Sequence, residues 1–453
     1  MKQLQALRKS YGRSAPLPFM EMTEKLLQYI WQHQYFNPSG LRTTAGDALQ
    51  IVFPGYWNRN QGPDFSEAQV KIGNTLMAGS IELHIRSSLW YDHGDSNDPN
   101  YNNVILHVVY EHNDAAMPRI PVLELEPLIP KILLERYTAL MNGSGFIPCS
   151  LTIGSAPQLV WLSWKDRLVA ERLTRKSQVV FNYLQENNGH WEECFWWLVA
   201  RNFGSKVNAE AFEQIARSLP LKVMARHRNQ VIQLEALLFG QAGLLNEKYG
   251  DAYPNLLARE YGFLKKKYGL QPISSALHFL RMRPGNFPTI RLAQLAAMLH
   301  VSDHLFSGVL DCEDVNSMRG QLNLCGNDYW HYHYLFDEPS PFRKKILGKE
   351  MIDNVISNTV IPFLFAYGSY KGEEKFKTKA VDWLQMLEPE INVHTKGFVD
   401  LKVDNCSSFD SQALIELKTQ YCDQRRCLHC AIGNAILKTG TRAEQAQQAN
   451  SHV

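Results

Sequence analysis

Alternating apolar and polar positions between residues 65 and 86 predict a β-hairpin. Phe65 to Ile72 forms the first strand, Gly73-Asn74 supplies a tight reversal, and the return strand runs from about Thr75 to Ile85. A period of two places Glu82 and His84 side by side on one face of the return strand. Charged groups rarely enter strands without a partner or a function, so this face is a candidate site.

Asp64 stands directly before the first strand, after a Gly-Pro turn. The same count places Asp64 on the face of Ala68 and Val70 and places Lys71 on the opposite face, unless a β-bulge intervenes. Carboxylates at the start of one strand and in the middle of its neighbour can converge on a divalent cation. We therefore expect Asp64 and Glu82 to share a metal; the simpler interpretation is a turn-capping aspartate and a solvent-facing glutamate.

The remaining pattern divides the chain into an α/β part and a helical part. Around the hairpin it predicts a helix, three further strands and a second helix, namely Met20 to Tyr35, Leu49 to Phe53, Val104 to Tyr110, Pro121 to Leu128 and Ile132 to Met141. The stretch from Tyr91 to Asn103 has room for one turn of helix at most. The first part is thus an α/β core over residues 1–150.

From Pro157 onwards the apolar period changes to 3.6 residues, which is typical of helices. Predicted helices include Leu159 to Asn187, Trp191 to Asn202, Glu210 to Ser218, Val231 to Leu245, Pro254 to Tyr268, Thr289 to His300, Ile346 to Tyr367 and Ser411 to Gln420. We therefore expect a mainly α-helical region over 151–400 and a separate C-terminal segment over 401–453, whose polar end from Thr439 frays.

Composition narrows the class of protein. The chain has 453 residues, 45% hydrophobic and 20% charged, which is ordinary for a globular protein of two or three domains. A formal net charge of +2 gives no global attraction to nucleic acid, so such binding requires local patches. No apolar run reaches the ~18 residues of a membrane span, and the first residues lack a signal-peptide core, so we expect a cytoplasmic protein without membrane contact.

Pro63-Asp64 followed by Glu82-Leu83-His84 resembles the signature of the PD-(D/E)XK restriction-endonuclease-like superfamily, with His84 in place of the lysine. The resemblance implies a restriction-endonuclease-like α/β core and metal-dependent hydrolysis of phosphodiesters in DNA or RNA. Asp64 and Glu82 would hold a Mg or Mn ion, and His84 would take the proton of the attacking water. Glu24 would be the helix acid that such folds add to the site; its alternative is a boundary salt bridge.

Two other functions fit the same residues. The first is a non-catalytic nucleic-acid-binding or assembly protein that kept the fold and lost the lysine. The second is a hydrolase of another small substrate, with histidines around a transition metal. The loop after the return strand either brings His93 and Asp92 to the metal or is a solvated connection, whereas His107 and His112 read as structural histidines.

A second candidate metal site is Cys422-x4-Cys427-x2-Cys430. Three cysteines this close in a chain with no paired disulfide framework indicate zinc or an iron–sulfur cluster, with unligated thiols as the alternative. Cys406 is the best fourth ligand by position. Some restriction-like nucleases carry a four-cysteine iron–sulfur cluster whose last three ligands lie near the C-terminus, and by that resemblance Cys149 is the rival.

Four arginines are candidates for nucleic-acid binding. Arg283 and Arg291 flank a Pro-Gly-Asn-Phe-Pro segment and either contact a phosphate backbone or pair with acids across a helix junction. Arg425 and Arg426 lie among the C-terminal cysteines and suit phosphate binding or solubility equally well. The sequence leaves the oligomeric state open.

Motifs along nearly the whole chain resemble an uncharacterised bacterial family, defined as a domain of unknown function. They are Glu24 to Trp31, Gln61 to Phe65, Ile105 to Val109, Arg283 to Arg291 and Tyr421-Cys422 with Cys427 to Cys430. This resemblance implies the extent of the folded chain and no particular activity.

Overall fold

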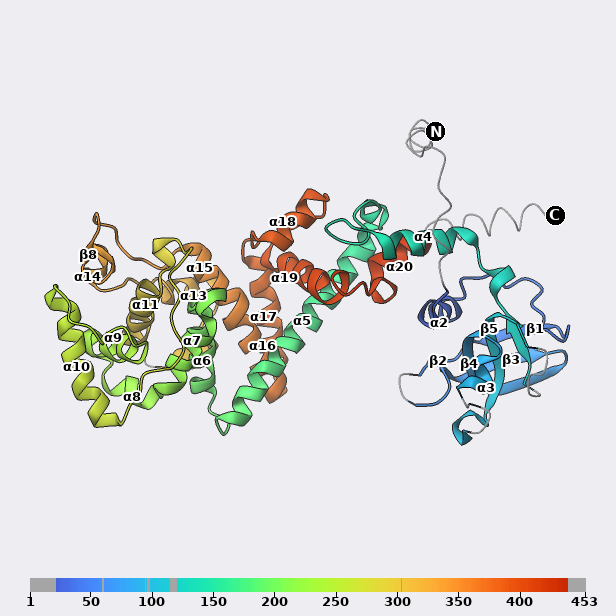
Figure 1. The fold of residues 1–453 in the computed structure, drawn as a ribbon, viewed down its shortest axis with the longest axis horizontal. Coiled ribbons are helices and arrows are strands. Elements are labelled where there is room, and N and C mark those ends of the chain that lie inside the picture. Colours follow the sequence, from blue (N-terminus) through green and yellow to red (C-terminus); the bar gives the residue numbers. More distant parts are fainter. Residues whose placement is uncertain are drawn as a thin grey trace, which may run out of the picture. The chain divides into compact units, whose positions relative to one another are not determined.

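The computed structural model describes residues 22–58, 61–93, 95, 98–114, 120–302 and 304–438. The predicted start of the first helix at Met20 and the polar end from Thr439 lie outside these residues. The chain forms two compact units, coloured along the sequence in Figure 1. Unit 1 comprises residues 1–164 and 418–453, and unit 2 comprises residues 165–417. The C-terminal cysteines thus belong to the same unit as the N-terminal sheet.

Unit 1 is built on a mixed sheet with the strand order β1-β3-β4-β5-β6, in which β2 also pairs with β3. The strands are β1 (Leu49–Phe53), β2 (Tyr56–Trp57), β3 (Phe65–Ile72), β4 (Thr75–Arg86), β5 (Val104–Glu111) and β6 (Val122–Glu124). β1, β3 and β4 are antiparallel neighbours, whereas β4, β5 and β6 run parallel. The β3–β4 hairpin and the mixed α/β character predicted from the sequence are confirmed.

Unit 1 also contains helices. They are α2 (Glu24–Gln32), α3 (Leu89–Asp92), α4 (Lys131–Asn142) and α20 (Ala431–Lys438), with short turns η2 (Pro99–Tyr101), η3 (Glu126–Leu128), η4 (Ile153–Ser155) and η8 (Cys427–His429) and the π-helical η7 (Leu417–Cys422). Figure 1 shows α2 alongside the sheet. Leu26 and Ile30 of α2 pack with Ile81 and Leu83 of β4 and with Leu437 of α20. The apolar stripe of α2 therefore fixes this helix beside β4.

Unit 2 is helical, as predicted for most of this region. Its elements are α5 (Gln158–Glu186, which begins in unit 1), α6 (Trp191–Phe203), α7 (Ser205–Ser218), α8 (Leu221–Arg226), α9 (Val231–Gln241), α10 (Ala252–Tyr268), η5 (Pro284–Asn286), α11 (Pro288–Val301), α12 (Leu305–Asp311), α13 (Val315–Gln321), α14 (Asp328–His331), β7 (His333–Leu335), β8 (Glu338–Pro339), α15 (Lys349–Val355), η6 (Ile356–Val360), α16 (Ile361–Lys371), α17 (Glu374–Met386), α18 (Val393–Asp400) and α19 (Ser408–Glu416). The helix predicted over Ile346 to Tyr367 begins at Lys349 and widens into the π-helical η6 before Pro362. No described helix is long and apolar enough to span a membrane.

Buried Glu235 of α9 gives unit 2 a pH-dependent stability. Its side chain is fully buried and accepts hydrogen bonds from the Tyr253 hydroxyl (2.6 Å) and the Trp330 indole (3.1 Å). Burial raises the pKa of Glu235 to about 7 from 4.5. Because the pKa is raised in the folded state, protonated Glu235 contributes stability that is fully present below pH 4.5. This contribution is lost as the pH rises through 7.

We expect Glu235→Gln to flatten this dependence. Between pH 5 and pH 8 the wild type should lose about 3 kcal/mol of unfolding free energy through this group, since one pKa unit corresponds to about 1.4 kcal/mol. Chemical denaturation at both pH values, for the wild type and the variant, measures the difference. Exposed Glu247→Gln is the control, and an unchanged pH dependence in Glu235→Gln would contradict the assignment.

Candidate functional site

A β-bulge in β3 places Asp64 beside Glu82. Phe65 pairs with Ile81 and Ala68 pairs with Gly79, so β3 holds one extra residue there, and Glu67 has φ 57°. One extra residue reverses the faces of everything before it. The prediction that Asp64 shares a face with Ala68 and Val70 was therefore wrong, and the structure brings Asp64 to the side of Glu82.

The same bulge changes the position of Lys71. Beyond the bulge, Lys71 pairs with Leu76, which shares the face of Glu82 because both are even-numbered on β4. Six residues of strand separate Leu76 from Glu82, about 20 Å at the usual rise. Lys71 therefore faces the correct way but lies too far along the sheet to replace the lysine of the superfamily signature.

Asp64 and Glu82 hold each other through the backbone. The Asp64 N–H donates to Glu82 Oε2 (2.9 Å), and the Leu83 N–H donates to Asp64 Oδ2 (3.2 Å). Gln28 of α2 donates to Asp64 Oδ1 (2.7 Å). Burial raises the pKa of Asp64 to about 7, against these hydrogen bonds and with added repulsion from Glu24. These hydrogen bonds fix Asp64 between α2 and the middle of β4, beside Glu82.

Glu82 lies at the centre of an acidic group. Its residue is 7% exposed, and burial raises its pKa to about 9, with the neighbouring Asp64 carboxylate as the next cause. The pKa of Asp95 is also raised by burial, and the pKa of Tyr101 is raised by burial and then by the charges of Glu82 and Asp95. Each of these acids, when ionised, makes the electrostatic potential around Glu82 more negative and so disfavours ionisation of its neighbours.

His84 joins the acids to two further histidines. Its Nε2 lies 3.3 Å from Asp95 Oδ2, 3.7 Å from Glu82 Oε1 and 3.2 Å from His93 Nδ1. Its Nδ1 lies 3.0 Å from Nε2 of His107, which is fully buried on β5. Both ring nitrogens of His84 are therefore occupied by the site itself.

Burial keeps both inner imidazoles neutral. It lowers the pKa of His84 to about 4, with repulsion from His93 as the second cause. It lowers the pKa of His107 to about 3, with repulsion from His84 and then His112 as the further causes. A neutral imidazole has one N–H and one lone pair. If His84 Nδ1–H donates to His107, the lone pair of His84 Nε2 faces Glu82 and Asp95, which is the tautomer that can bind a metal.

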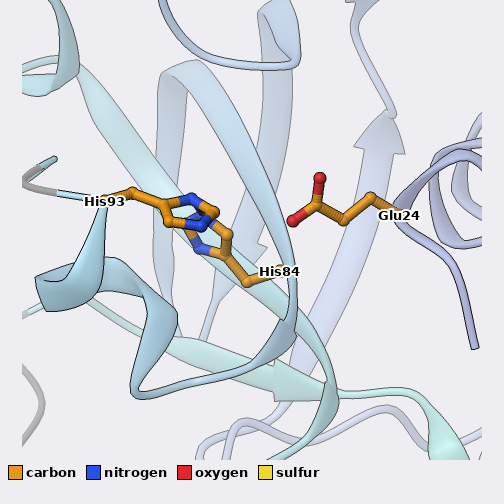
Figure 2. A group of neighbouring side chains, drawn as sticks. All are labelled: Glu24, His84 and His93. Carbon is orange, nitrogen blue, oxygen red and sulfur yellow. Dashed lines mark hydrogen bonds between the residues drawn. The ribbon is translucent and has the colours of Figure 1, made fainter.

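Two overlapping sets of side chains could hold a cation. One is Glu82, His84 and Asp95, all buried; the other is Glu24, His84 and His93. In each set the ligand atoms lie within 4.8 Å of one another. Figure 2 shows the Glu24 carboxylate pointing from its helix towards the crossed rings of His84 and His93. Both sets share His84, so one ion near its Nε2 would touch members of each.

No lysine or arginine compensates these acids within the described part of the chain. Neither Glu24, Asp64, Glu82 nor Asp95 forms an ion pair with a lysine or arginine there. The predicted salt-bridge alternative for Glu24 thus has no described partner. Unpaired buried carboxylates are costly, and a bound cation removes that cost.

Sequence reasoning found part of this group. Asp64, Glu82, His84, Glu24 and His93 were candidates. The structure places Glu82, His84, Glu24 and His93 in the two ligand sets, whereas Asp64 lies beside Glu82 and belongs to neither set. The predicted partner of His93, Asp92, is exposed and in neither set; Asp95 takes that place. His107 was interpreted as structural, but the parallel pairing of Glu82 with His107 places its ring behind His84.

Comparison with known families matches residues 24–393 to the family described as Protein of unknown function (DUF2851). The chain belongs to the DUF2851 family. This confirms the resemblance to an uncharacterised family. No curated protein and no solved structure matches the chain. The DUF2851 match begins at Glu24, includes both sets of candidate ligands, and ends before Cys406 and the three C-terminal cysteines.

The cysteines of this DUF2851 protein form a second group in unit 1. Burial raises the pKa of Cys422, and the next causes are Cys430, Cys149 and Cys427 in that order. Burial likewise raises the pKa of Cys149 to about 12, with Cys430 and Cys427 next. All four are free thiols. Cys149 thus groups with the three C-terminal cysteines, whereas Cys406, the fourth ligand favoured by the sequence, is exposed and belongs to unit 2. Which of the two ligates a metal stays a prediction.

The backbone at the start of α20 lies close to Cys427 and Cys430. The N–H groups of Ile432 and Gly433 hydrogen-bond to Cys430. A Cβ at Gly433 would lie 2.4 Å from the carbonyl oxygen of Cys427, so only glycine allows α20 to start this close. Backbone N–H groups directed at sulfur stabilise thiolates, which are the form that binds metal.

The two arginines beside the cysteines are engaged within unit 1. Arg425 donates to the carbonyl oxygens of Met141 and Gly143, and its φ is 51°. Arg426 donates to the Gln420 carbonyl (3.2 Å) and stacks on a tyrosine ring. Both guanidinium groups tie the cysteine loop to the chain around it, and their contact with nucleic acid stays a prediction.

Proposed function

We propose that unit 1 is a metal-dependent hydrolase of phosphodiester bonds in DNA or RNA. The observation that carries the proposal is the buried set Glu82, His84 and Asp95, with no lysine or arginine paired to its acids in the described chain. The order of elements further supports the proposal. A restriction-endonuclease-like core is expected to run from a helix through three antiparallel strands and a crossover to a parallel strand, and unit 1 has this order with a short crossover.

The donor set fits a divalent cation, and one imidazole beside two carboxylates favours Mn²⁺ over Mg²⁺. When bound there, such an ion polarises a phosphoryl group and neutralises the charge that develops on its oxygens. Glu82 and Asp95 would be the oxygen ligands and His84 Nε2 the nitrogen ligand. Because His84 is occupied on both nitrogens, we reassign the role of proton acceptor for the attacking water to His93, the exposed histidine of the group.

The test is divalent-metal-dependent cleavage of a panel of single-stranded and double-stranded DNA and RNA by the full chain. Cleavage with Mn²⁺ and none with EDTA is the expected result. The distance of Lys71 from the site favours a second candidate, a nucleic-acid-binding protein on a degenerate nuclease fold. Salt-dependent binding without cleavage under any metal would decide for that candidate.

His107→Gln should weaken Mn²⁺ binding by about 10- to 100-fold, the usual cost of losing a group that orients a metal-ligating histidine. Isothermal titration with Mn²⁺ measures the change. His112→Gln is the matched control: like His107, His112 is in neither ligand set, but its described hydrogen bond is from its backbone N–H to Glu124 and not to His84. Equal affinities in His107→Gln and wild type would exclude the orienting role.

We also propose that Cys149, Cys422, Cys427 and Cys430 hold a soft metal centre. Each of these thiols shifts the pKa of another in the group or has its own pKa shifted by one, so the four lie in one place. Four cysteine ligands suit either a zinc ion or an iron–sulfur cluster.

A further inference from the structure

A basic cavity lies within unit 2, and its lining contains no residue discussed so far for metal binding. It has a volume of about 1040 Å³ and is walled by α5, α6, α7, α11, the segment 343–351 and the η6–α16 junction. Small-molecule sites occupy roughly 300–1,000 Å³, so this cavity has the size of a whole organic ligand. Because its walls come from segments between Lys176 and Phe363, it is a product of the folded unit.

The charged residues of the lining are lysines and arginines, with Glu350 as the single acidic residue among them. Arg291, Lys345 and Lys176 are buried or half-buried, and Arg283, Arg343 and Lys344 are exposed. The cavity therefore has basic residues both in its interior and at its exposed rim. An ordinary solvated surface differs, because charges of both signs alternate there.

Arg291 is a buried cation without an acidic partner. It is 7% exposed, and its two terminal nitrogens donate to the amide oxygens of Gln294 (2.9 Å) and Asn286 (2.6 Å). Its Nε has no hydrogen-bond partner. Burial lowers its pKa to about 10. By contrast, Arg201 in the same lining is paired with Glu213. The expected pairing of Arg291 with an acid across the helix junction was wrong.

Lys345 repeats this feature, and Lys176 shares it in part. Lys345 is 4% exposed, and its ammonium donates to the Arg343 carbonyl and lies 3.8 Å from the centre of the Tyr334 ring. The Lys176 ammonium donates to the Asn358 side chain (2.9 Å); burial followed by repulsion from Arg172 lowers its pKa, and attraction to Glu390 and Glu416 opposes that shift. Arg291 and Lys345 line one cavity and donate to neutral groups, so they leave a positive field that an anion would neutralise.

We propose that this cavity binds a small molecule carrying a chain of two or more phosphate groups, as in a nucleoside polyphosphate or an inorganic polyphosphate. Guanidinium groups pair with phosphate oxygens in a bidentate manner, and ammonium groups add point charges. A single carboxylate would leave most of the charge uncompensated. The apolar walls from Val180, Leu198 and Phe363 offer a surface for an organic group beside the phosphates. This site is independent of the proposed cleavage in unit 1.

The test is isothermal titration of the full chain in EDTA with ATP, inorganic tripolyphosphate, adenosine and a dT12 oligonucleotide. EDTA removes divalent cations, so the result does not depend on the metal centre of unit 1. ATP or tripolyphosphate should bind, with affinity that falls as salt rises, and adenosine should not. Tighter binding of ATP identifies the nucleotide as the source of the phosphates, and equal binding identifies the phosphate chain alone.

Arg291→Gln and Lys345→Met should each weaken tripolyphosphate binding at least about tenfold, since each removes a charge-assisted contact. Exposed Arg343→Gln is a second variant that bears little on folding, and exposed Lys266→Met on α10 is the matched control outside the cavity. Failure of both phosphate ligands to bind would overturn the proposal. So would binding of dT12 that tripolyphosphate does not displace, or equal affinities in the three cavity variants and wild type.

Discussion

Glu82→Gln should reduce Mn²⁺-dependent cleavage to background and at the same time make unit 1 more stable to heat in EDTA. The carboxylate is needed only when a cation is present. Without one, its charge is disfavoured by burial and by Asp64, which together raise its pKa to about 9. Glutamine keeps an oxygen that accepts from the Asp64 N–H and removes the repulsion. We expect a rise in Tm of a few degrees, as about 1 kcal/mol would give.

The same experiment includes its controls. Glu67→Gln changes an exposed carboxylate in the bulge of β3 and should leave cleavage and Tm unchanged. Adding Mn²⁺ should raise the Tm of wild type and not that of Glu82→Gln, because only the wild type retains the full ligand set. Full cleavage by Glu82→Gln would exclude a catalytic ion at this position. A lower Tm in EDTA would mean that the acidic group is stabilised in some other way.

The hairpin could be predicted because its signals are local. Alternation over 65–86 and the Gly73-Asn74 reversal suffice to specify β3, β4 and the shared face of Glu82 and His84. The bulge could not be predicted, since Glu67 adopts a positive φ without the glycine that usually marks such a position. One residue of register therefore reversed the assignment of Asp64 and Lys71, although the convergence of Asp64 with Glu82 had been expected.

The other half of the metal site depends on contacts between distant segments. His107 reaches His84 because β5 returns parallel to β4, and the register of a parallel pair is not encoded in either strand alone. Asp95 reaches the other ring nitrogen of His84, Nε2, through a connection whose sequence resembles a solvated loop. Histidine and aspartate in such places have several common roles, so their partners become visible only in the folded unit.

Proximity in sequence also misled the choice among cysteines and arginines. Cys406 is near the C-terminal cysteines along the chain, yet it belongs to unit 2. The cysteines lie in the part of unit 1 that starts at Lys418, and Cys149 belongs to that unit as well. Arg291 stands in a motif that suggests a surface patch, yet it is buried against amides in a cavity shared with Lys176 and Lys345. Whether a basic residue is buried without an acidic partner depends on the fold, and the motif around Arg291 does not reveal it.

Removal of the soft metal should loosen the C-terminal segment of unit 1 and leave unit 2 intact. Cys427 and Leu437 are part of the hydrophobic core around α2, and the Tyr35 hydroxyl donates to Asn434 of α20 (3.0 Å). Metal ligation would hold this short helix against that core, so its free energy would be part of the folding free energy. Hydrogen exchange after chelation should therefore increase over 418–438 and not over α6 or α11.

Three variants define the ligands. Protein purified without oxygen should contain zinc, or iron with matching sulfide, and Cys149→Ser and Cys427→Ser should each abolish it, whereas Cys406→Ser should retain it. The comparison is sharp because Cys149 is far from the C-terminal cysteines in sequence and Cys406 is near. Zinc in place of iron would keep the four-cysteine site and exclude the cluster. Metal lost in Cys406→Ser but kept in Cys149→Ser would contradict the grouping of thiols. A wild type that contains no metal would mean that apolar packing alone holds α20.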